Sequence, residues 1–186
     1  MKRMIVCGDR NWTDFDIVRS YIEMARMMGF DSIVEGEAEG ADSMARDIGK
    51  VLGFEVISEF ANWDAYHKAA GPIRNAKMLT YKPILCLAFH KNIQESKGTL
   101  NMITQARKAG VPVILVDAEE AVQVFLPTKA TWMIMESVKG FLVTLVCDAM
   151  NAREDEVPYT KEDKVPFTRD DAEEFMKERG LDAVHK

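Results

Sequence analysis

The sequence predicts an α/β fold: a Rossmann-like, doubly wound parallel sheet with a small C-terminal addition. Residues 1–117 alternate five times between a short apolar run and a stretch with helical spacing. The apolar runs are continuous rather than alternating, which is typical of strands covered by helices on both faces. Glycines and polar clusters separate the segments, as expected for turns at strand ends.

Five apolar runs are the predicted strands. Because ligands of such folds bind at the carboxyl ends of the strands, the polar turns that follow them are the first places to look for a site. The expected strands cover residues 4–7, 32–35, 54–57, 83–89 and 111–116.

Four stretches between these strands are the predicted helices. Thr13 is expected to cap the first, with Asp16 completing a capping box and Gly29 ending the helix. A polar loop containing Trp63 and Tyr66 is expected before the third helix. The helical stretches lie within residues 13–29, 40–53, 71–79 and 98–110.

We expect a domain boundary near residue 118, with residues 1–118 forming the ligand-binding domain and residues 119–186 the C-terminal addition. Residues 151–167 are charged and contain two prolines, which indicates a linker. A final helix is expected over residues 169–179, capped by Thr168 and acidic near its positive end.

The first part of the addition allows two interpretations. Residues 122–125, 131–135 and 141–147 are rich in β-branched, aromatic and Met residues, which favours a small β-meander. One long helix over residues 132–153 is the alternative, and Gly140 would weaken it.

Composition limits the function classes. The 186 residues are 47% apolar and carry a formal charge of −6, which argues against non-specific binding of duplex DNA and makes nucleic acid a poor candidate partner. No run approaches the length of a membrane span, so we expect no membrane partner. Cys7, Cys86 and Cys147 each lie in an apolar run, which indicates buried free thiols and a cytoplasmic protein.

Four polar, glycine-containing clusters follow the predicted strand ends, and in this fold all four loops should converge on one edge of the sheet. A glycine turn that enters a helix presents free N–H groups and the positive end of the helix dipole, which suits a phosphate. One such cluster is usually structural, whereas four at equivalent places favour a shared ligand site. The clusters are Gly8-Asp9-Arg10-Asn11-Trp12, Gly36-Glu37-Ala38-Glu39-Gly40-Ala41-Asp42, Gly71-Pro72-Ile73-Arg74-Asn75 and Ser96-Lys97-Gly98-Thr99.

These clusters supply the candidate ligand-binding residues. Cationic side chains would hold a phosphate, and amides and hydroxyls would bind a sugar or base. Trp12, Trp63 and Tyr66 could each stack on a base, or each could anchor its loop by packing against the domain. The candidates are Gly8, Asp9, Arg10, Asn11, Trp12, Gly36, Gly40, Ala41, Trp63, Gly71, Asn75, Ser96, Lys97, Gly98 and Thr99.

The candidate catalytic residues are Asp42, Glu35 and Arg74. A carboxylate close to the sugar would stabilise the oxocarbenium-like state of N-glycosidic hydrolysis. Asp42 equally suits the first turn of a helix, and the acidic loop around Glu35 could be a solvated surface.

His67 and His90 are isolated and indicate no metal site, and we expect no cofactor. A dinucleotide fingerprint is absent after Gly8, which excludes an NAD dehydrogenase.

Five blocks occur in a fixed order: GDRNWTD, EGEAEGAD, ANWDAYHKAAGPIRNAKML, AFHKNIQESKGT and GVPV. Over residues 1–117 they resemble the YspA-type branch of the SLOG superfamily. SLOG proteins are Rossmann-like and related to the cytokinin-activating phosphoribohydrolases and to the DprA DNA-processing proteins. The resemblance implies a nucleotide or nucleotide-derived ligand and a homo-oligomer. It places the site at Gly8, Arg10, Gly36, Gly40, Asp42, Gly71, Arg74, Asn75, Lys97, Gly98 and Thr99.

The sequence departs from the phosphoribohydrolases at one catalytic position. Their Gly-Gly-x-Gly-Thr-x-x-Glu block ends in a catalytic Glu, where this chain has Met102. Three functions therefore stay open: hydrolysis of the N-glycosidic bond of a nucleotide, non-catalytic sensing or sequestration of a nucleotide signal of the phage-defence type, and a DprA-like single-stranded DNA or protein adaptor.

Overall fold

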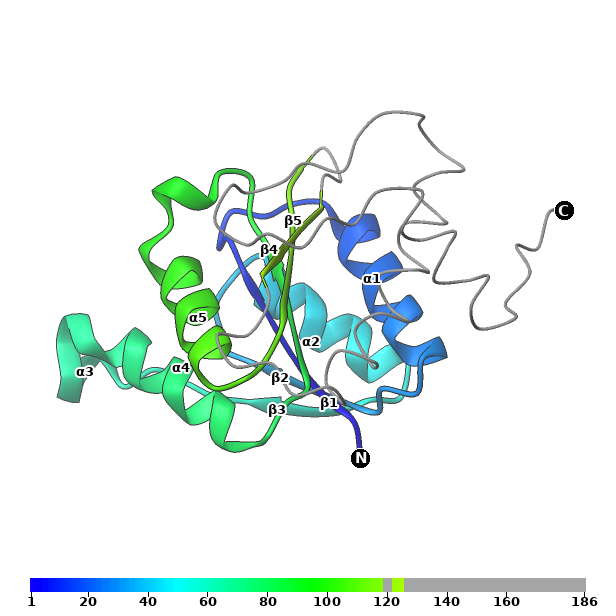
Figure 1. Ribbon diagram of the computed structural model, residues 1–186, viewed down its shortest axis with the longest axis horizontal. Helices are drawn as coiled ribbons and strands as arrows, with labels where there is room; N and C mark the ends of the chain where they lie inside the picture. The colour runs from blue at the N-terminus through cyan, green and yellow to red at the C-terminus, as the bar shows by residue number, and fades with distance from the viewer. Residues whose placement is uncertain (119–121, 126–186) are drawn as a thin grey trace, which may run out of the picture.

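A six-stranded sheet in the order β3-β2-β1-β4-β5-β6 organises the described residues, 1–118 and 122–125, of the computed structural model (Figure 1). Strands β1 to β5 pair in parallel, and β6 pairs antiparallel with β5. The strands are β1 (Arg3–Gly8), β2 (Ser32–Glu35), β3 (Glu55–Ser58), β4 (Leu85–Phe89), β5 (Val113–Val116) and β6 (Val122–Phe125). The mostly parallel, Rossmann-like α/β fold expected from the sequence is confirmed.

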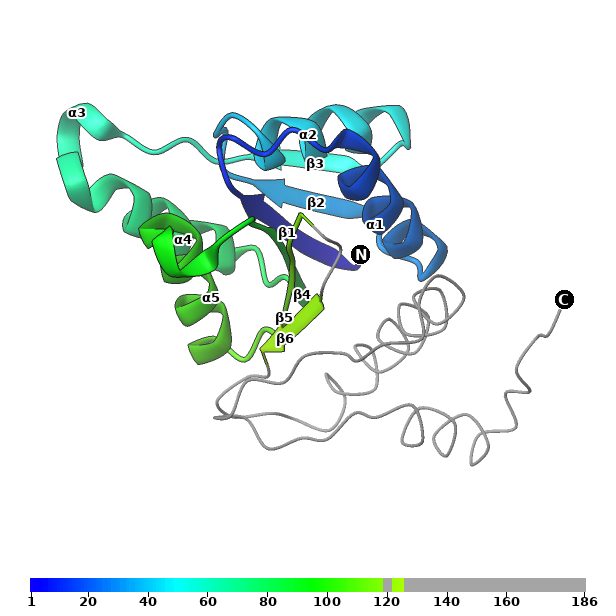
Figure 2. The ribbon, with the colours of Figure 1, turned by 90° about the horizontal axis from the view of Figure 1, so that it is seen from above.

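Helices cover both faces of the sheet, with α1 and α2 on one side and α4 and α5 on the other (Figure 2). The short helix α3 projects from the body of the protein in both views (Figure 1, Figure 2). The helices are α1 (Phe15–Met27), α2 (Ala41–Val51), α3 (Trp63–Tyr66), α4 (Ala70–Thr80) and α5 (Lys97–Lys108).

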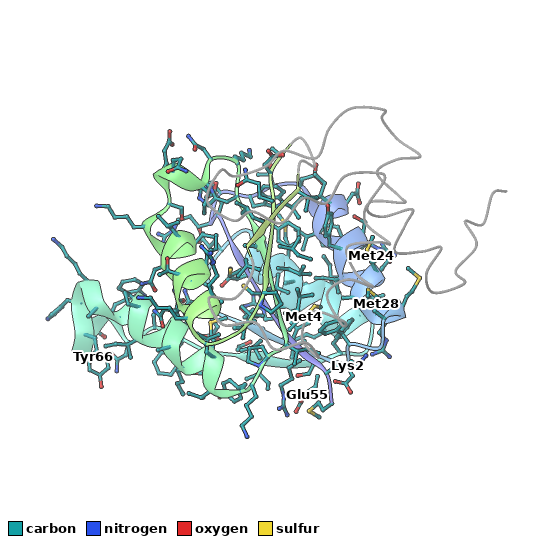
Figure 3. The ribbon with its side chains drawn as sticks, in the orientation of Figure 1. Lys2, Met4, Met24, Met28, Glu55 and Tyr66 are labelled. Atoms are coloured by element: carbon teal, nitrogen blue, oxygen red, sulfur yellow. The ribbon has the colours of Figure 1, made fainter. Side chains whose placement is uncertain are left out.

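Strand β1 shows why its apolar run is unbroken. Successive side chains of a strand point to opposite faces, and here both faces are covered. Met4 and Val6 join the core under α1 and α2, whereas Ile5 and Cys7 join the core under α4 and α5. Figure 3 shows Met4 of the first core, with Met24 and Met28 labelled on and just after α1.

The start of α1 corrects one expectation. Asp14, rather than Thr13, is the N-cap: its Oδ1 accepts a hydrogen bond of 3.0 Å from the amide of Ile17. Both residue types favour the cap position, so the sequence alone did not separate them. With the cap at Asp14, Asp16 lies in the first turn, where it complements the helix dipole, and forms no capping box.

The segment around Trp63 and Tyr66 also differs from expectation. It was expected to be a loop, but it forms helix α3, followed by the 3-10 turn His67–Ala69. The side chain of Asn62 caps α3 by accepting a hydrogen bond of 3.0 Å from Ala65 N. A single capped turn carries too few residues for a helical pattern to show in the sequence.

The C-terminal expectations are tested at one segment only. Val122–Phe125 is a strand, as expected, and it extends the edge of the main sheet. The expected strands 131–135 and 141–147, the alternative helix 132–153, the linker, the final helix and Cys147 lie outside the described residues. Within the described part of the chain, no helix has the length and apolar character needed to cross a membrane.

Candidate ligand-binding cleft

The candidate site lies where the chain order of the sheet reverses. From β1 the chain proceeds outward to β2 and β3, then crosses to β4 on the other side of β1. The carboxyl ends of β1 and β4 therefore border the crevice in which ligands of doubly wound folds bind. Gly8 ends β1, Gly36 follows β2, and His90 follows β4 at this edge.

Two adjoining cavities occupy this edge. The larger has a volume of about 440 Å³ and is lined by Arg10, Gly36, Glu37, Ala38, Glu39, Phe60, Ala61, Trp63 and Arg74. The smaller has a volume of about 160 Å³ and is lined by Cys7, Gly8, Asp9, Arg10, Ala38, Asp42, Arg74, Asn75, His90, Ser96, Gly98, Thr99 and Met102. The four sequence clusters thus meet at one edge, and Arg10, Ala38 and Arg74 line both cavities.

Two glycines allow the loops to approach this closely. A Cβ on Gly36 would lie 1.1 Å from Nη1 of Arg74, and a Cβ on Gly40 would lie 2.3 Å from the carbonyl oxygen of Asp9. Gly40 also has a φ of 70°, a left-handed conformation that favours glycine. These glycines therefore pack the second cluster against the first and third.

The carboxylate of Asp42 accepts hydrogen bonds from backbone amides of the second cluster. Its Oδ2 accepts a hydrogen bond of 2.9 Å from Gly36 N, and a backbone hydrogen bond from Ala38 also reaches the carboxylate. Burial raises the pKa of Asp42 to about 6, although Arg74 and the Gly36 amide act to lower it. The Gly36 amide therefore faces a carboxylate of the protein itself.

Arg74 lies at the boundary of the two cavities. Its Nη1 is 3.5 Å from Oδ2 of Asp42, and its side chain is 15% exposed. The Nε atom is buried and has no hydrogen-bond partner among the described residues. A buried N–H without a partner costs free energy, so a ligand acceptor at this place would relieve that cost. Arg10, which lines both cavities with it, is exposed.

Glu59 fixes the helix that carries Arg74. Lys77 Nζ of α4 lies 2.7 Å from Oε2 of Glu59, and the hydroxyl of Tyr81 donates a hydrogen bond to Oε1. Burial acts to raise the pKa of Glu59, but the hydrogen bonds from Lys77 and Tyr81 outweigh it, and the pKa lies below its usual value. This cluster ties α4 to the end of β3.

Glu35 contacts other groups of the protein and lines neither cavity. Its side chain is fully buried; Oε2 accepts a hydrogen bond of 2.7 Å from Glu37 N, and Ser58 donates to Oε1. Arg46 lies 3.9 Å from the same Oε1. These contacts hold the loop after β2, and Glu35 lies beside the lining residues Gly36 and Glu37 without lining either cavity itself.

The fourth cluster joins α4 to α5. Ser96 Oγ accepts a hydrogen bond of 3.0 Å from Thr99 N and caps α5. Asn75 Nδ2 donates to Oδ1 of Asn101 at 3.0 Å and to the carbonyl of Gly98 at 3.4 Å. The amide hydrogens of Asn75 are therefore used within the protein.

Several predicted ligand residues line neither cavity. Lys97 and Asn11 are exposed, Ala41 is fully buried, and Gly71 lies against Trp63. Because Lys97 lines neither cavity, the cationic Lys or Arg side chains among the lining residues are Arg10 and Arg74.

The three aromatic candidates have different positions. Trp12 was expected in a polar loop but is 2% exposed: its ring packs 5.7 Å from Phe89, and its Nε1 donates to the carbonyl of Asp14. It offers no free face to a base, which corrects the expectation. Trp63 is 54% exposed and lines the larger cavity. Tyr66 is exposed at the outer part of α3 (Figure 3).

Sequence reasoning missed several side chains of the cleft, Phe60 and His90 among them. Phe60 is 63% exposed and lines the larger cavity beside Trp63. It lies just after β3, and its exposure carried no sequence signal. His90 lines the smaller cavity, and its Nδ1 accepts a hydrogen bond of 3.1 Å from Asn92 N. The position of His90 directly after the predicted strand 83–89 could have indicated that it lies at the ligand-binding edge of the sheet.

The described part of the chain contains no group of three His, Cys, Asp or Glu residues placed to hold a metal ion. Cys7 and Cys86 are buried free thiols with their Sγ atoms 3.9 Å apart. The contact with Cys86 and burial raise the pKa of the Cys7 thiol well above its usual value. The thiol therefore stays protonated and is a poor nucleophile.

Comparisons with known proteins add one relative and one fold. No protein-family model matches the chain. It is 35% identical over 121 residues to the Gene 61 protein of Mycobacterium phage D29, a match that covers 61% of this chain and 95% of that protein. The fold is similar to the X-ray structure of DNA processing protein A (DprA) from Streptococcus pneumoniae, with a TM-score of 0.51 and 15% identity. That likeness covers 76% of this chain and 56% of the DprA chain, and at this identity it shows the fold alone.

Proposed function

The chain belongs to the family of the Gene 61 protein of Mycobacterium phage D29, and we propose that it binds a nucleotide or nucleotide-derived small molecule in the cleft. The observation that carries this proposal is the placement of Arg10 and Arg74 in the wall common to both cavities. A guanidinium binds a phosphate bidentately, and the buried Nε of Arg74 has no partner among the described residues.

The larger cavity supports the organic part of such a ligand. Its volume of about 440 Å³ lies within the range of small-molecule sites. Phe60 and Trp63 present exposed aromatic surface to it, and a base can stack on either ring. The arginines and these aromatic rings together match the phosphate and the base of a nucleotide.

We assign the chain to the SLOG superfamily, in its YspA-type branch. Five sequence blocks support the assignment, and all four polar clusters contribute residues to the walls of the cavities or pack beside them. The fold likeness to DprA agrees with the superfamily, and the branch rests on the sequence blocks.

The lining of the cleft favours binding of a nucleotide without hydrolysis of its N-glycosidic bond. Met102 lines the smaller cavity at the position where the phosphoribohydrolases carry a catalytic Glu. Hydrolysis of the N-glycosidic bond is the second candidate. It is favoured by Asp42, a buried carboxyl that lines the same cavity with a pKa of about 6, close to the pH at which a general acid or base works best.

Single-stranded DNA is a third candidate. The fold likeness to a protein named for DNA processing favours it, as does the pairing of exposed aromatic side chains with arginines, an arrangement that binds single strands. The net charge of −6 argues against a long cationic groove that would bind the phosphates of a DNA strand.

Calorimetric titration tests the proposal. The purified chain would be titrated with nucleoside monophosphates and dinucleoside monophosphates of all four bases, and chromatography would follow the release of free base. We expect at least one compound to bind, Arg74→Gln to weaken it at least tenfold, and Lys97→Gln, the matched loss of an exposed charge outside the lining, to leave it unchanged. No binding by any compound, or equal losses in both variants, would overturn the proposal.

A further inference from the structure

The charges of the cleft follow a symmetric pattern. Arg10 and Arg74 line the wall that the two cavities share. Both cavities also carry carboxyl groups: Glu37 and Glu39 in the larger, and Asp9 and Asp42 in the smaller, where Asp42 lies 3.5 Å from Arg74. The favourable place for an anion is therefore the boundary between the cavities.

The acidic side chains also indicate what fills the cavities on each side. A carboxylate accepts hydrogen bonds and repels an anion, so hydroxyl and amino groups suit its surroundings and a phosphate does not. The larger cavity has room for a nucleoside, whereas the smaller, at about 160 Å³, takes only part of an organic group. A ligand that uses the whole cleft thus has an organic group on each side of its anion.

We propose that the cleft selects a nucleotide whose phosphate is internal, a phosphodiester or pyrophosphate bridge between two organic groups, over a nucleotide that ends in a phosphate. The proposal rests on the proposed nucleotide binding and adds the position of the phosphate within the ligand. Arg10 and Arg74 hold the bridge, and the groups on either side fill the two cavities.

Simple attraction between charges would favour the opposite preference. A terminal phosphate carries about −1.5 to −2 charges near pH 7, whereas a diester carries one. If two arginines merely attracted an anion, the terminal phosphate would bind more tightly. A measured preference for the diester would therefore result from the acidic side chains around the arginines and from organic groups that fill both cavities.

The first test compares each nucleoside 5′-monophosphate with the dinucleoside monophosphate of the same base, for example AMP with ApA. We expect at least one dinucleotide to bind tenfold or more tightly than its monophosphate. Monophosphates that bind as tightly as dinucleotides would overturn this inference while leaving nucleotide binding intact. Failure of every compound would overturn the proposed function itself.

The second test removes the acidic charges of the larger cavity. The double variant Glu37→Gln, Glu39→Gln is expected to raise the affinity for monophosphates at least threefold more than the affinity for dinucleotides. The control Glu23→Gln, Asp47→Asn has the same charge change at exposed positions on α1 and α2 and is expected to leave the ratio of affinities unchanged. An unchanged ratio in the first variant would overturn the inference.

The third test separates a small molecule from a nucleic acid strand, because both contain internal phosphates. Homo-oligonucleotides of two, four and eight residues would be titrated, with affinities expressed per binding site. We expect the affinity to level off at two residues, since the cleft accepts one bridge. An affinity that rises steadily up to eight residues would overturn the proposal of a small-molecule ligand and would indicate that the cleft binds single-stranded nucleic acid.

Discussion

Arg74 of α4 and Asp42 of α2 meet in the wall of the smaller cavity, with Nη1 of Arg74 3.5 Å from Oδ2 of Asp42. Asp42 also binds the amide of Gly36, so one carboxylate joins the loop after β2 to α4. The pair orients the guanidinium while its Nε stays without a partner among the described residues. Ligand binding and the ionisation of Asp42 are consequently linked.

The stability of the protein should depend on the pH through Asp42. Burial raises its pKa from 3.8 to about 6, so the folded state binds this proton more tightly than the unfolded state. The stabilising contribution is fully present below about pH 3.8 and is lost as the pH rises through about 6. The shift corresponds to about 3 kcal/mol.

Urea unfolding between pH 4 and 7.5 measures this effect. We expect wild type to lose stability relative to Asp42→Asn as the pH rises. Asp47→Asn, which removes an exposed carboxylate of the same helix, should follow wild type. Parallel stability curves for wild type and Asp42→Asn would contradict the burial of an ionisable Asp42.

Gly36 and Gly98 should respond oppositely to the same substitution. In Gly36→Ala the new Cβ would displace Nη1 of Arg74, the end of a flexible side chain, so we expect at least tenfold weaker nucleotide binding and a loss of only about 1 kcal/mol of stability. In Gly98→Ala the Cβ meets nothing within 4 Å, and α5 should gain up to about 1 kcal/mol. Titration and urea unfolding measure both; equal effects would contradict the close approach at Gly36.

Trp12 and Trp63 should separate stability from binding. Trp12→Ala removes a buried ring and is expected to cost about 3–5 kcal/mol of unfolding free energy. Trp63→Ala removes an exposed ring, so the stability should change by less than about 0.5 kcal/mol. Nucleotide binding should weaken in Trp63→Ala if a base stacks there. A stable Trp12→Ala would contradict the packing on Phe89.

Cys7 and Cys86 should resist alkylation in the folded protein. Both are buried, and the pKa of Cys7 is raised by its contact with Cys86 and by burial. Iodoacetamide labelling followed by peptide mapping is expected to modify them at least tenfold more slowly than in urea-unfolded protein. Rapid labelling of Cys7 without unfolding would contradict a protonated thiol at the cavity wall.

The sheet and the meeting of the loops could be predicted from the sequence because both depend on simple patterns. Unbroken apolar runs such as residues 4–7 indicate strands covered on both faces, and parallel strands bring their carboxyl ends to one edge. Gly36 and Arg74 could be placed at that edge from these patterns alone.

Individual side chains could not be placed in this way. Lys97 and Thr99 share one cluster, but the rotation of α5 exposes Lys97 and turns Thr99 to the smaller cavity. Trp12 stands in a polar stretch and is buried because its ring finds Phe89 on β4. The amide of Gly36 was expected to face a ligand, and its actual partner, Asp42, depends on the fold of the loop.

The measurement that tests the central claim most directly is mass spectrometry of small molecules released on denaturation from the purified wild type, Arg74→Gln and Lys97→Gln. The account predicts a nucleotide in stoichiometric amount from wild type and Lys97→Gln, and its loss from Arg74→Gln. The same nucleotide in equal amount from all three proteins, or none from wild type even after incubation with a nucleotide extract, would contradict it.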